Sequence, residues 1–537
     1  LDGDARQVHA EGELATEYHV SPRGDFVAFR ENYEAFAMPL LPGGQAVTVG
    51  EEASSLPVVR ASKGGADYIG WTEGGDMLTW SMGPVLYRAG LASMFASAPK
   101  DKDAPKFVPP TSGTSLERTV SADKPRATVA ITGAKILTMT GDGAGEIADG
   151  TIVIVGDRIA AVGPASSVQI PQGATMIDAA GKTIMPGLVD AHAHGPQGVG
   201  DLVPQQNWSL VQNLAMGTTT IHDPSSSASM IFSASERQQA GNMLAPRIFS
   251  TAEVVYGAKA PGVYARIDSY EDALAHIQRI KAQGGISIKN YNQPRREQRQ
   301  QVVAAARAEN MLVVAEGGSL FGMDMNLIAD GNSTIEHNVP GEVFYEDVLQ
   351  YWAGSQSNYT PTLVVTYGGL AADPYWRQAT DVFDNPLMVH TPPRQLIAET
   401  ARRVTAPEWA FVDDEAAREA KKLAQRGVKV SIGAHGQQAG VGSHWELWSF
   451  VRGGMTPVES LRAGTIESAR SLGMDRDIGS LEAGKLADLI VLEADPSENI
   501  RNSDKIERVM IGGRLYDART MNEVETGDAR RLPYWWE

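Results

Sequence analysis

The chain has 537 residues, of which 42% are hydrophobic and 21% are charged, as in globular rather than disordered proteins. This length exceeds what one hydrophobic core can organise and predicts roughly two to four domains. The formal net charge of −18 would repel phosphate backbones and argues against nucleic acid as a partner, and the lack of cysteine excludes disulfides and thiolate ligands.

Two features of the chain bear on the membrane and on processing. The apolar run at residues 151–155, among the longest, falls well short of the ~18 residues that a spanning helix needs. We therefore expect no membrane span. The chain opens at Leu1 without an initiator methionine or a signal peptide, so we expect a processed or truncated product.

Residues 1–110 contain two segments with the same order of strand, Gly/Asp-rich turn and strand. They read HVSPRGDFVAFRENYEAFAMPLLPGG and IGWTEGGDMLTWSMGPVLYRAGL, with turn glycines Gly24 and Gly75. Both resemble blades of a TolB-type β-propeller, which implies an all-β domain and favours a periplasmic or secreted protein over a cytoplasmic one. Because two blades cannot close a propeller, we expect a second chain or precursor fragment to complete it. The alternative is an independent small β domain.

The next region begins with a change of composition toward Lys, Asp, Pro, Ser and Thr, and residues 111–124 are predicted as a linker. Short alternating strands follow in residues 125–187 and return in residues 468–525. These two blocks predict one small β-sandwich assembled from both sides of an inserted region. Residues 526–537 form a C-terminal tail.

Residues 188–467 alternate strand-like apolar runs with amphipathic helical patterns. The runs TTTIHD, RIFSTAEVV, GGISIKNY, MLVVAEGG, STIEHN, YTPTLVV and VKVSIGAHG each end in polar residues. This rhythm predicts parallel strands with helical crossovers, and hence an α/β fold with a (β/α)8 barrel inserted in the sandwich. Sites in such barrels lie at the carboxyl ends of the strands, so the residues that close the runs are candidates.

Histidines supply the strongest motif, PGLVDAHAH, which ends in His192 and His194. On a strand these two residues share one face, and paired imidazoles suit a divalent transition metal. His337 closes the run STIEHN and His435 closes VSIGAHG. We interpret two other histidines as structural, His276 and His390.

Lys289 closes the apolar run GGISIKNY, where a buried ammonium group would be costly without a partner. Carbamylation by carbon dioxide would turn this lysine into an anionic ligand that bridges two metal ions. The alternative is a salt bridge between Lys289 and Glu316.

Taken together, PGLVDAHAH, SIKNY, IEHN and the tail GSLEAGKLADLIVLEADP resemble the metal-dependent amidohydrolase superfamily, in particular its imidazolonepropionase- and prolidase-like branch, over about residues 125–520. The resemblance implies a binuclear site for divalent metal, expected to be zinc, with manganese or iron as alternatives. The family's ligands are matched by His192, His194, Lys289 and His337. Two positions depart from the family: Glu316 replaces a histidine and could still ligate, and His435 replaces an aspartate and could be a ligand, a general base or a hydrogen-bond donor.

The resemblance implies hydrolysis of an amide or related C–N bond, of the peptide or N-acyl amino acid type, through a metal-activated hydroxide. The leaving amine needs a proton donor with a pKa near neutrality, for which we favour His435 first and His444 second. His222, at the end of TTTIHD, is expected to shape the substrate pocket.

The segment KNYNQPRREQRQQ places Tyr291, Asn292 and Arg295 directly after Lys289, where they could clamp a substrate carboxylate. A solvated helix start is the alternative. Two other functions stay open: an esterase or lactonase that uses the same site, and a non-catalytic binding or scaffold protein. We expect a small-molecule or peptide substrate and a homo-oligomer.

Overall fold

The computed structural model describes most of the chain and divides into two compact units. The first unit is Leu1–Val120 with Glu253–Met311, and the second is Ser121–Ala252 with Leu312–Glu537. The described residues are 7–41, 46–96, 107–195, 197–198, 202–291, 293, 295–318, 320–341, 343–400 and 405–537. Within these ranges, no helix has both the length and the apolarity of a membrane span.

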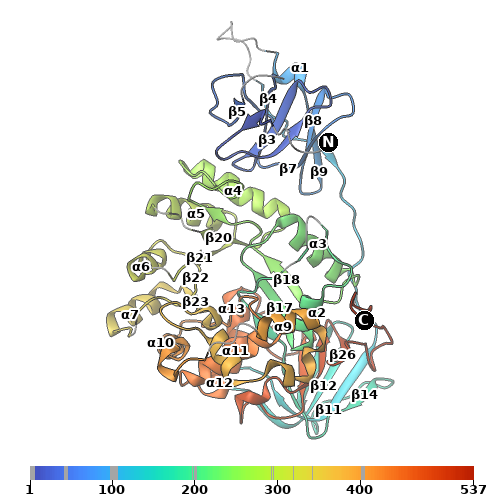
Figure 1. The fold of residues 1–537 in the computed structure, drawn as a ribbon. Coiled ribbons are helices and arrows are strands. Elements are labelled where there is room, and N and C mark those ends of the chain that lie inside the picture. Colours follow the sequence, from blue (N-terminus) through green and yellow to red (C-terminus); the bar gives the residue numbers. More distant parts are fainter. Residues whose placement is uncertain are drawn as a thin grey trace. The chain divides into compact units, whose positions relative to one another are not determined.

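The N-terminal part of the first unit consists of two four-stranded antiparallel sheets (Figure 1). One contains β2 (Thr16–Val20), β3 (Phe26–Glu31), β4 (Glu34–Pro39) and β6 (Val59–Arg60), and the other contains β7 (Asp67–Trp71), β8 (Met77–Met82), β9 (Val85–Gly90) and β10 (Thr114–Ser115). Shorter elements are β1 (Ala10–Glu11), which pairs in parallel with β5 (Val47–Thr48), and α1 (Leu91–Met94). The predicted strands are present, but a closed propeller is not confirmed.

Aromatic pairs across neighbouring strands stabilise each of these sheets. Phe29 on β3 lies opposite Phe36 on β4, with ring centroids 5.4 Å apart. Trp80 on β8 lies opposite Tyr87 on β9, with ring centroids 5.8 Å apart. Such cross-strand pairs contribute about 0.2–1 kcal/mol each and fix the register of the strands.

The remainder of the first unit comprises β19 (Val255–Tyr256), α4 (Tyr270–Gln283), β20 (Ser287–Tyr291) and α5 (Arg296–Ala308). The α4 helix begins with a capping box between Ser269 and Asp272. Its buried Arg279 lies 3.8 Å from the ring centroid of Tyr33 and 3.1 Å from Glu253 Oε2. A segment that the sequence assigned to the barrel at 188–467 therefore packs with the N-terminal sheets, because α4 supplies an aromatic and ionic contact to them.

The second unit contains an eight-stranded sheet made from both sides of the inserted region. Its strands are β11 (Thr128–Leu137), β12 (Glu146–Val155), β13 (Arg158–Pro164), β14 (Thr175–Asp178), β15 (Thr183–Pro186), β24 (Leu489–Leu492), β25 (Ile506–Ile511) and β26 (Arg514–Asp517). The two blocks meet where Ile184 of β15 pairs with Val491 of β24. Ile131 and Leu489 pack in the same buried cluster, so burial on one face holds the blocks together.

Parallel strands with helical connections fill the rest of the second unit (Figure 1). One sheet contains β16 (Leu188–Asp190), β17 (Thr218–Asp223) and β18 (Arg247–Ser250), and β21 (Leu312–Glu316), β22 (Thr334–Glu336) and β23 (Asn358–Thr360) also pair in parallel. The α-helices are α2 (Trp208–Ala215), α3 (Ala228–Gln239), α6 (Phe321–Ala329), α7 (Glu346–Ser355), α8 (Ala372–Ala379), α9 (Pro393–Thr400), α10 (Asp413–Ala424), α11 (Val441–Arg452), α12 (Pro457–Arg462) and α13 (Ser468–Ser471).

The strand expected from the run VKVSIGAHG is not a regular strand, and the assigned sheets do not close a barrel. Only Val430 in this run forms a β-bridge. The backbone N–H groups of Gly433 and Ala434 donate instead to side-chain carboxylates, Glu446 Oε2 at 3.3 Å and Asp190 Oδ1 at 3.1 Å. These carboxylates satisfy two N–H groups of the run, whereas the N–H groups of Ser431 and His435 donate to the carbonyl oxygens of Tyr359 and His192.

Candidate metal centre

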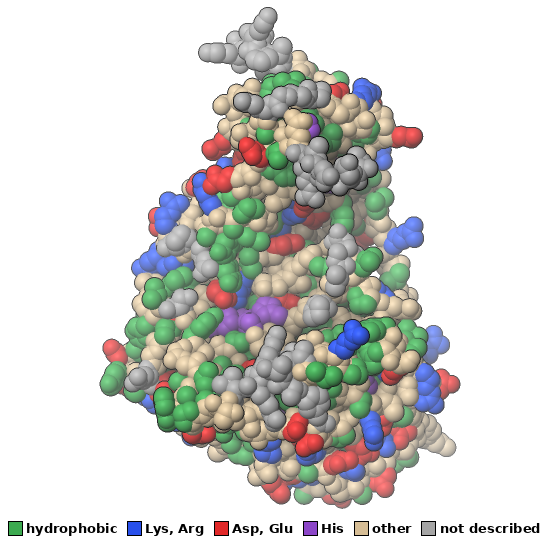
Figure 2. All heavy atoms as spheres, in the orientation of Figure 1, with side chains coloured by type: hydrophobic (Ala, Val, Ile, Leu, Met, Phe, Trp, Pro, Cys, Tyr) green, Lys and Arg blue, Asp and Glu red, His purple; other side chains and the backbone are tan. Residues whose placement is uncertain are grey.

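Four of the predicted histidines converge in the second unit. His192 and His194 follow β16, His337 follows β22, and His435 ends the irregular run. The ring centroid of His192 lies 5.0 Å from that of His194, 4.9 Å from that of His337 and 5.1 Å from that of His435. One ring nitrogen from each of His192, His337 and His435 lies within 4.8 Å of the others. Figure 2 shows histidine side chains visible at the molecular surface.

The backbone holds two of these histidines in an uncommon conformation. His337 has φ of 69° and His435 has φ of 56°, in the left-handed region that non-glycine residues seldom adopt. Each is fixed by its own N–H group, His337 donating to Thr360 O and His435 donating to His192 O, both at 2.9 Å. Such conformations persist where the surroundings impose them, commonly at functional sites.

Each ring also has a polar partner at Nδ1. The pairs are His192 with Glu336 Oε2 at 2.6 Å, His194 with Asp223 Oδ1 at 3.0 Å, His337 with Thr362 Oγ1 at 2.7 Å, and His435 with Gln437 Oε1 at 2.8 Å. A carboxylate can only accept, so the Nδ1 atoms of His192 and His194 donate and their Nε2 atoms carry the ring lone pair. This is the usual arrangement around histidines that bind metals.

The distance between the two Nε2 atoms of the HxH pair fits a cation site. His192 Nε2 lies 3.1 Å from His194 Nε2. With both Nδ1 atoms acting as donors, two lone pairs would face each other at this separation unless a proton or a cation lay beside them. Neutral imidazole is a preferred ligand of zinc and related divalent ions, so the donor set fits a transition metal.

Carboxylates surround the histidines. Glu316 Oε1 lies 3.2 Å from His337 Nε2. Burial raises the pKa of Asp190 to about 7, although its Oδ1 accepts the His192 N–H at 3.2 Å. Burial also raises the pKa of Asp324 to about 7, and the charge of Glu316 adds to this. A cation would offset the charge of this acidic environment.

Four predicted residues belong to the first unit or lie outside the described residues. Lys289 is buried on β20, with Nζ 5.9 Å from the ring centroid of Tyr291, which itself packs against Tyr256. Arg295 is exposed and precedes α5 as its N-cap residue. Asn292 is outside the described residues. The bridging role of Lys289 and the substrate roles of the other three stay predictions.

Among the described residues, two further predicted histidines, His222 and His444, are not part of the group of three ring nitrogens formed by His192, His337 and His435. His222 on β17 is buried, and its Nδ1 lies 3.0 Å from Ala191 O. His444 on α11 is buried, with Nδ1 2.9 Å from Ser503 Oγ and Nε2 2.9 Å from Met216 O. Because both ring nitrogens of His444 are hydrogen-bonded and burial lowers its pKa, we interpret it as structural rather than as the proton donor expected from the sequence.

Sequence reasoning missed the side chains that orient the rings. Asp223 and Glu336 are the last residues of β17 and β22, and each stands next to a histidine, His222 or His337. A search for carboxylates at the strand ends would have found both. Thr362 follows β23 and carries no comparable signal in the sequence.

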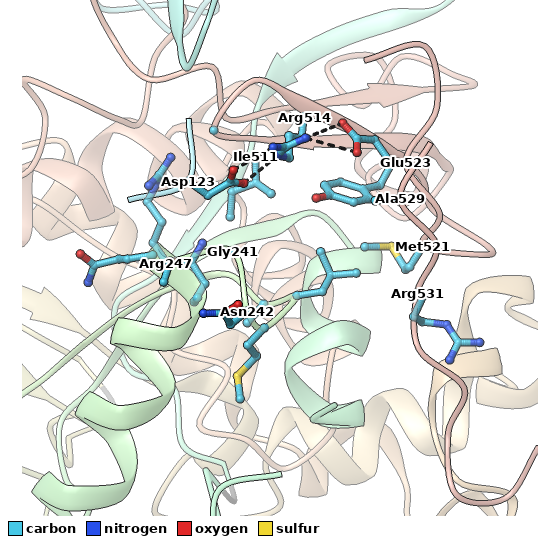
Figure 3. A pocket seen from close by; sticks show the side chains of 18 of the residues that line it. Asp123, Gly241, Asn242, Arg247, Ile511, Arg514, Met521, Glu523, Ala529 and Arg531 are labelled. Carbon is cyan, nitrogen blue, oxygen red and sulfur yellow. Dashed lines mark hydrogen bonds and ion pairs between the residues drawn. The ribbon is translucent and has the colours of Figure 1, made fainter. Parts of the chain in front are cut away.

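A cavity of about 460 Å³ lies elsewhere in the second unit (Figure 3). One wall contains Arg514, which donates to Asp123 at 2.7 and 2.8 Å and to Glu523 at 3.1 Å. None of the four clustered histidines, all of which the structure describes, lines this cavity. The cavity is therefore separate from the candidate metal centre.

Comparison with known proteins identifies related sequences and folds. A family model described as "Amidohydrolase family" matches residues 183–516. A 5-methylthioadenosine/S-adenosylhomocysteine deaminase of Moorella thermoacetica is 25% identical over 430 residues, which are 72% of this chain and 93% of that protein.

Two solved structures share the fold. A Xaa-Pro dipeptidase with bound methionine has a TM-score of 0.57 and 20% identity, covering 73% of this chain and 100% of that one. A putative prolidase from Bifidobacterium longum has a TM-score of 0.55 and 25% identity, covering 72% and 94%. The family match begins beyond residues 1–110, and the TolB resemblance finds no support in these comparisons.

Proposed function

The chain belongs to the amidohydrolase family and is a hydrolytic enzyme that acts on C–N bonds, and we propose that its substrate is an amide of a peptide or of an N-acyl amino acid. The observation that carries this proposal is the cluster of His192, His337 and His435, whose ring nitrogens lie within 4.8 Å of one another. The solved relatives named as a dipeptidase and a prolidase support an amide substrate. Family membership speaks against the scaffold alternative.

The cofactor that we propose is divalent metal, with zinc as the expected ion and two ions per chain. His192, His194, His337 and His435 would hold it, and Glu316 is positioned to contribute an oxygen. When bound, such an ion polarises a carbonyl group and lowers the pKa of water. We also propose that Lys289, once carbamylated, would help to hold a second ion, and metal analysis that finds one ion per chain would remove this part of the proposal.

The chain's own residues have defined tasks in this proposal. Glu336 and Asp223 accept hydrogen bonds from Nδ1 of His192 and His194 and so keep both Nε2 atoms as electron-pair donors. We favour a ligand role for His435 over the acid role, because its ring nitrogen groups with those of His192 and His337.

A second candidate function is removal of an exocyclic amine, which the deaminase relative favours. The two functions differ in product, since amide hydrolysis releases an amino acid or peptide and deamination releases ammonia. The test incubates the zinc-loaded chain with alanyl-proline, N-acetyl-alanine, a lactone and 5′-methylthioadenosine.

We expect cleavage of an amide, loss of the activity with a chelator, and loss of both metal and turnover in His192→Ala. His9→Ala, which removes an exposed histidine outside the cluster, serves as the matched control. Ammonia release without amide cleavage would replace our proposal with the deaminase function. Undiminished turnover in His192→Ala would remove the metal centre from the reaction.

A further inference from the structure

Large apolar side chains are exposed on the segments that follow three consecutive parallel strands of the second unit. Leu320 and Phe321 follow β21, with Phe321 as the first residue of α6, Val343 follows β22, and Tyr367 follows β23. Their exposed fractions are 66%, 40%, 51% and 44%. We call these four residues the apolar strip.

The strip adjoins the metal centre through Tyr367. The ring centroid of Tyr367 lies 5.6 Å from that of His337, in an edge-on arrangement. Two reciprocal hydrogen bonds hold this position: Tyr367 N donates to Asn338 Oδ1 at 2.6 Å, and Asn338 Nδ2 donates to Tyr367 O at 3.1 Å. Because Asn338 directly follows His337, the backbone of Tyr367 is tied to the chain segment that carries a candidate ligand.

Two glycines lie against members of the strip, Gly318 against Tyr367 and Gly341 against Phe321. Gly318 has φ of +90°, and a Cβ there would overlap the ring of Tyr367 and lie 3.0 Å from the Cβ of His337. Gly341 lies against Phe321, since a Cβ built on it would be 3.8 Å from Phe321 Cδ2. The backbone of the loop after β21 thus packs against Tyr367 on one side, and the loop after β22 packs against Phe321.

Exposed apolar side chains that gather in one place commonly mark a binding groove, because water contact with them is unfavourable and a ligand can relieve it. Figure 2 shows hydrophobic side chains on the same face as the visible histidines. We propose that the apolar strip binds a large apolar group attached next to the scissile amide, either an acyl chain or an apolar amino acid side chain. This inference rests on the proposed function and narrows its substrate class.

The expected preference for a long acyl group over a short one depends on the number of methylenes that the strip would cover. Burial of only two methylenes raises affinity roughly tenfold. The zinc-loaded full chain should therefore hydrolyse N-octanoyl-alanine with a kcat/KM at least about tenfold above that for N-acetyl-alanine. The rate of hydrolysis of alanyl-phenylalanine, compared with that of dialanine, tests whether an amino acid side chain rather than an acyl chain supplies the apolar group.

Two truncations of the strip test whether it causes the preference. Tyr367→Ala and Leu320→Ser should each lower the octanoyl-to-acetyl ratio about three- to tenfold, mainly through KM, with unchanged zinc content. Met176→Ala is the matched control, because Met176 is 55% exposed on β14 of the eight-stranded sheet, away from the strip. Circular dichroism and thermal midpoints check that each variant folds.

Binding of octanoate against acetate, measured by calorimetry on the zinc-loaded chain, separates this inference from the proposed function. If no amide is cleaved but Tyr367→Ala still weakens octanoate binding, the proposed function fails and the apolar site stands. If amides are cleaved but both truncations leave the octanoyl preference and octanoate binding unchanged, the strip is not the binding site and our inference is overturned.

Discussion

Replacing Glu336 with glutamine isolates the contribution of one buried charge to metal binding. Glu336 Oε2 lies 2.6 Å from His192 Nδ1, and the side chains of His192 and Glu336 are 0% and 2% exposed. Glutamine keeps the shape and can still accept from Nδ1–H, but it loses the charge that makes the ring a better electron-pair donor. Partners of this kind contribute about 10–100-fold to metal affinity, or about 1.4–2.7 kcal/mol.

The assay is competition for zinc with a chromophoric chelator, run on folded wild-type and Glu336→Gln protein. We expect the variant's zinc affinity to fall within that 10–100-fold range. Asp223→Asn is the matched variant at His194, where the bond is 3.0 Å and the histidine side chain is 27% exposed, so its loss should be smaller. Equal zinc affinities for wild type and a correctly folded Glu336→Gln protein would refute this account of the site.

Three more predictions concern stability and packing. His444→Ala should cost about 2–4 kcal/mol of unfolding free energy, because it leaves a cavity and unpaired partners, while zinc content stays unchanged; zinc loss from a stably folded variant would contradict this. Burial lowers the pKa of His276 to about 3. Between pH 6.5 and 3 the unfolded chain therefore binds a proton that the folded chain does not, and the free energy of unfolding should decrease by up to about 1.4 kcal/mol per unit as the pH falls. Urea titrations at several pH values should show a smaller pH dependence of the unfolding free energy in His276→Gln than in wild type. An identical pH dependence in the two proteins would contradict this role of His276. Gly318→Ala should displace the ring of Tyr367 and strain a backbone with φ of +90°. We therefore expect the stability to fall by about 1 kcal/mol and the octanoyl preference to decrease. Kinetics and melting curves identical to those of wild type would disprove the contact between Gly318 and Tyr367.

The order of strands and helices along the chain could largely be predicted from the sequence, whereas the division of the chain into two compact units could not. The apolar run at residues 312–316 became the strand β21, with Val313, Val314 and Ala315 buried, because burial on both faces of a strand needs continuous apolar residues. The run at residues 428–436 stays irregular, and two of its N–H groups, those of Gly433 and Ala434, donate to the carboxylates of Glu446 and Asp190. Asp190 is 244 residues from Ala434 in the sequence, so periodicity could not reveal this contact. The pairing of Arg279 with Tyr33 is hidden for the same reason.

The spacing of His192 and His194 predicted correctly that their rings meet. The structure places both residues just beyond the end of β16, so their meeting does not depend on side-chain alternation within a regular strand. His444 was the second candidate for the proton donor, but its ring is hydrogen-bonded to Ser503 and Met216, neither of which is near it in the chain. A residue type and its position in a run therefore locate a candidate, whereas its hydrogen-bond partners decide its role.

The union of β15 with β24 has a consequence for how the protein assembles. Ile184 and Val491 are separated by the whole inserted segment, so this contact adds strongly to the contact order of the second unit. During synthesis, the edge of β15 that pairs with β24 stays unpaired until the last portion of the chain has emerged. Truncation before Leu489 would leave that edge permanently open and should yield protein that aggregates during refolding.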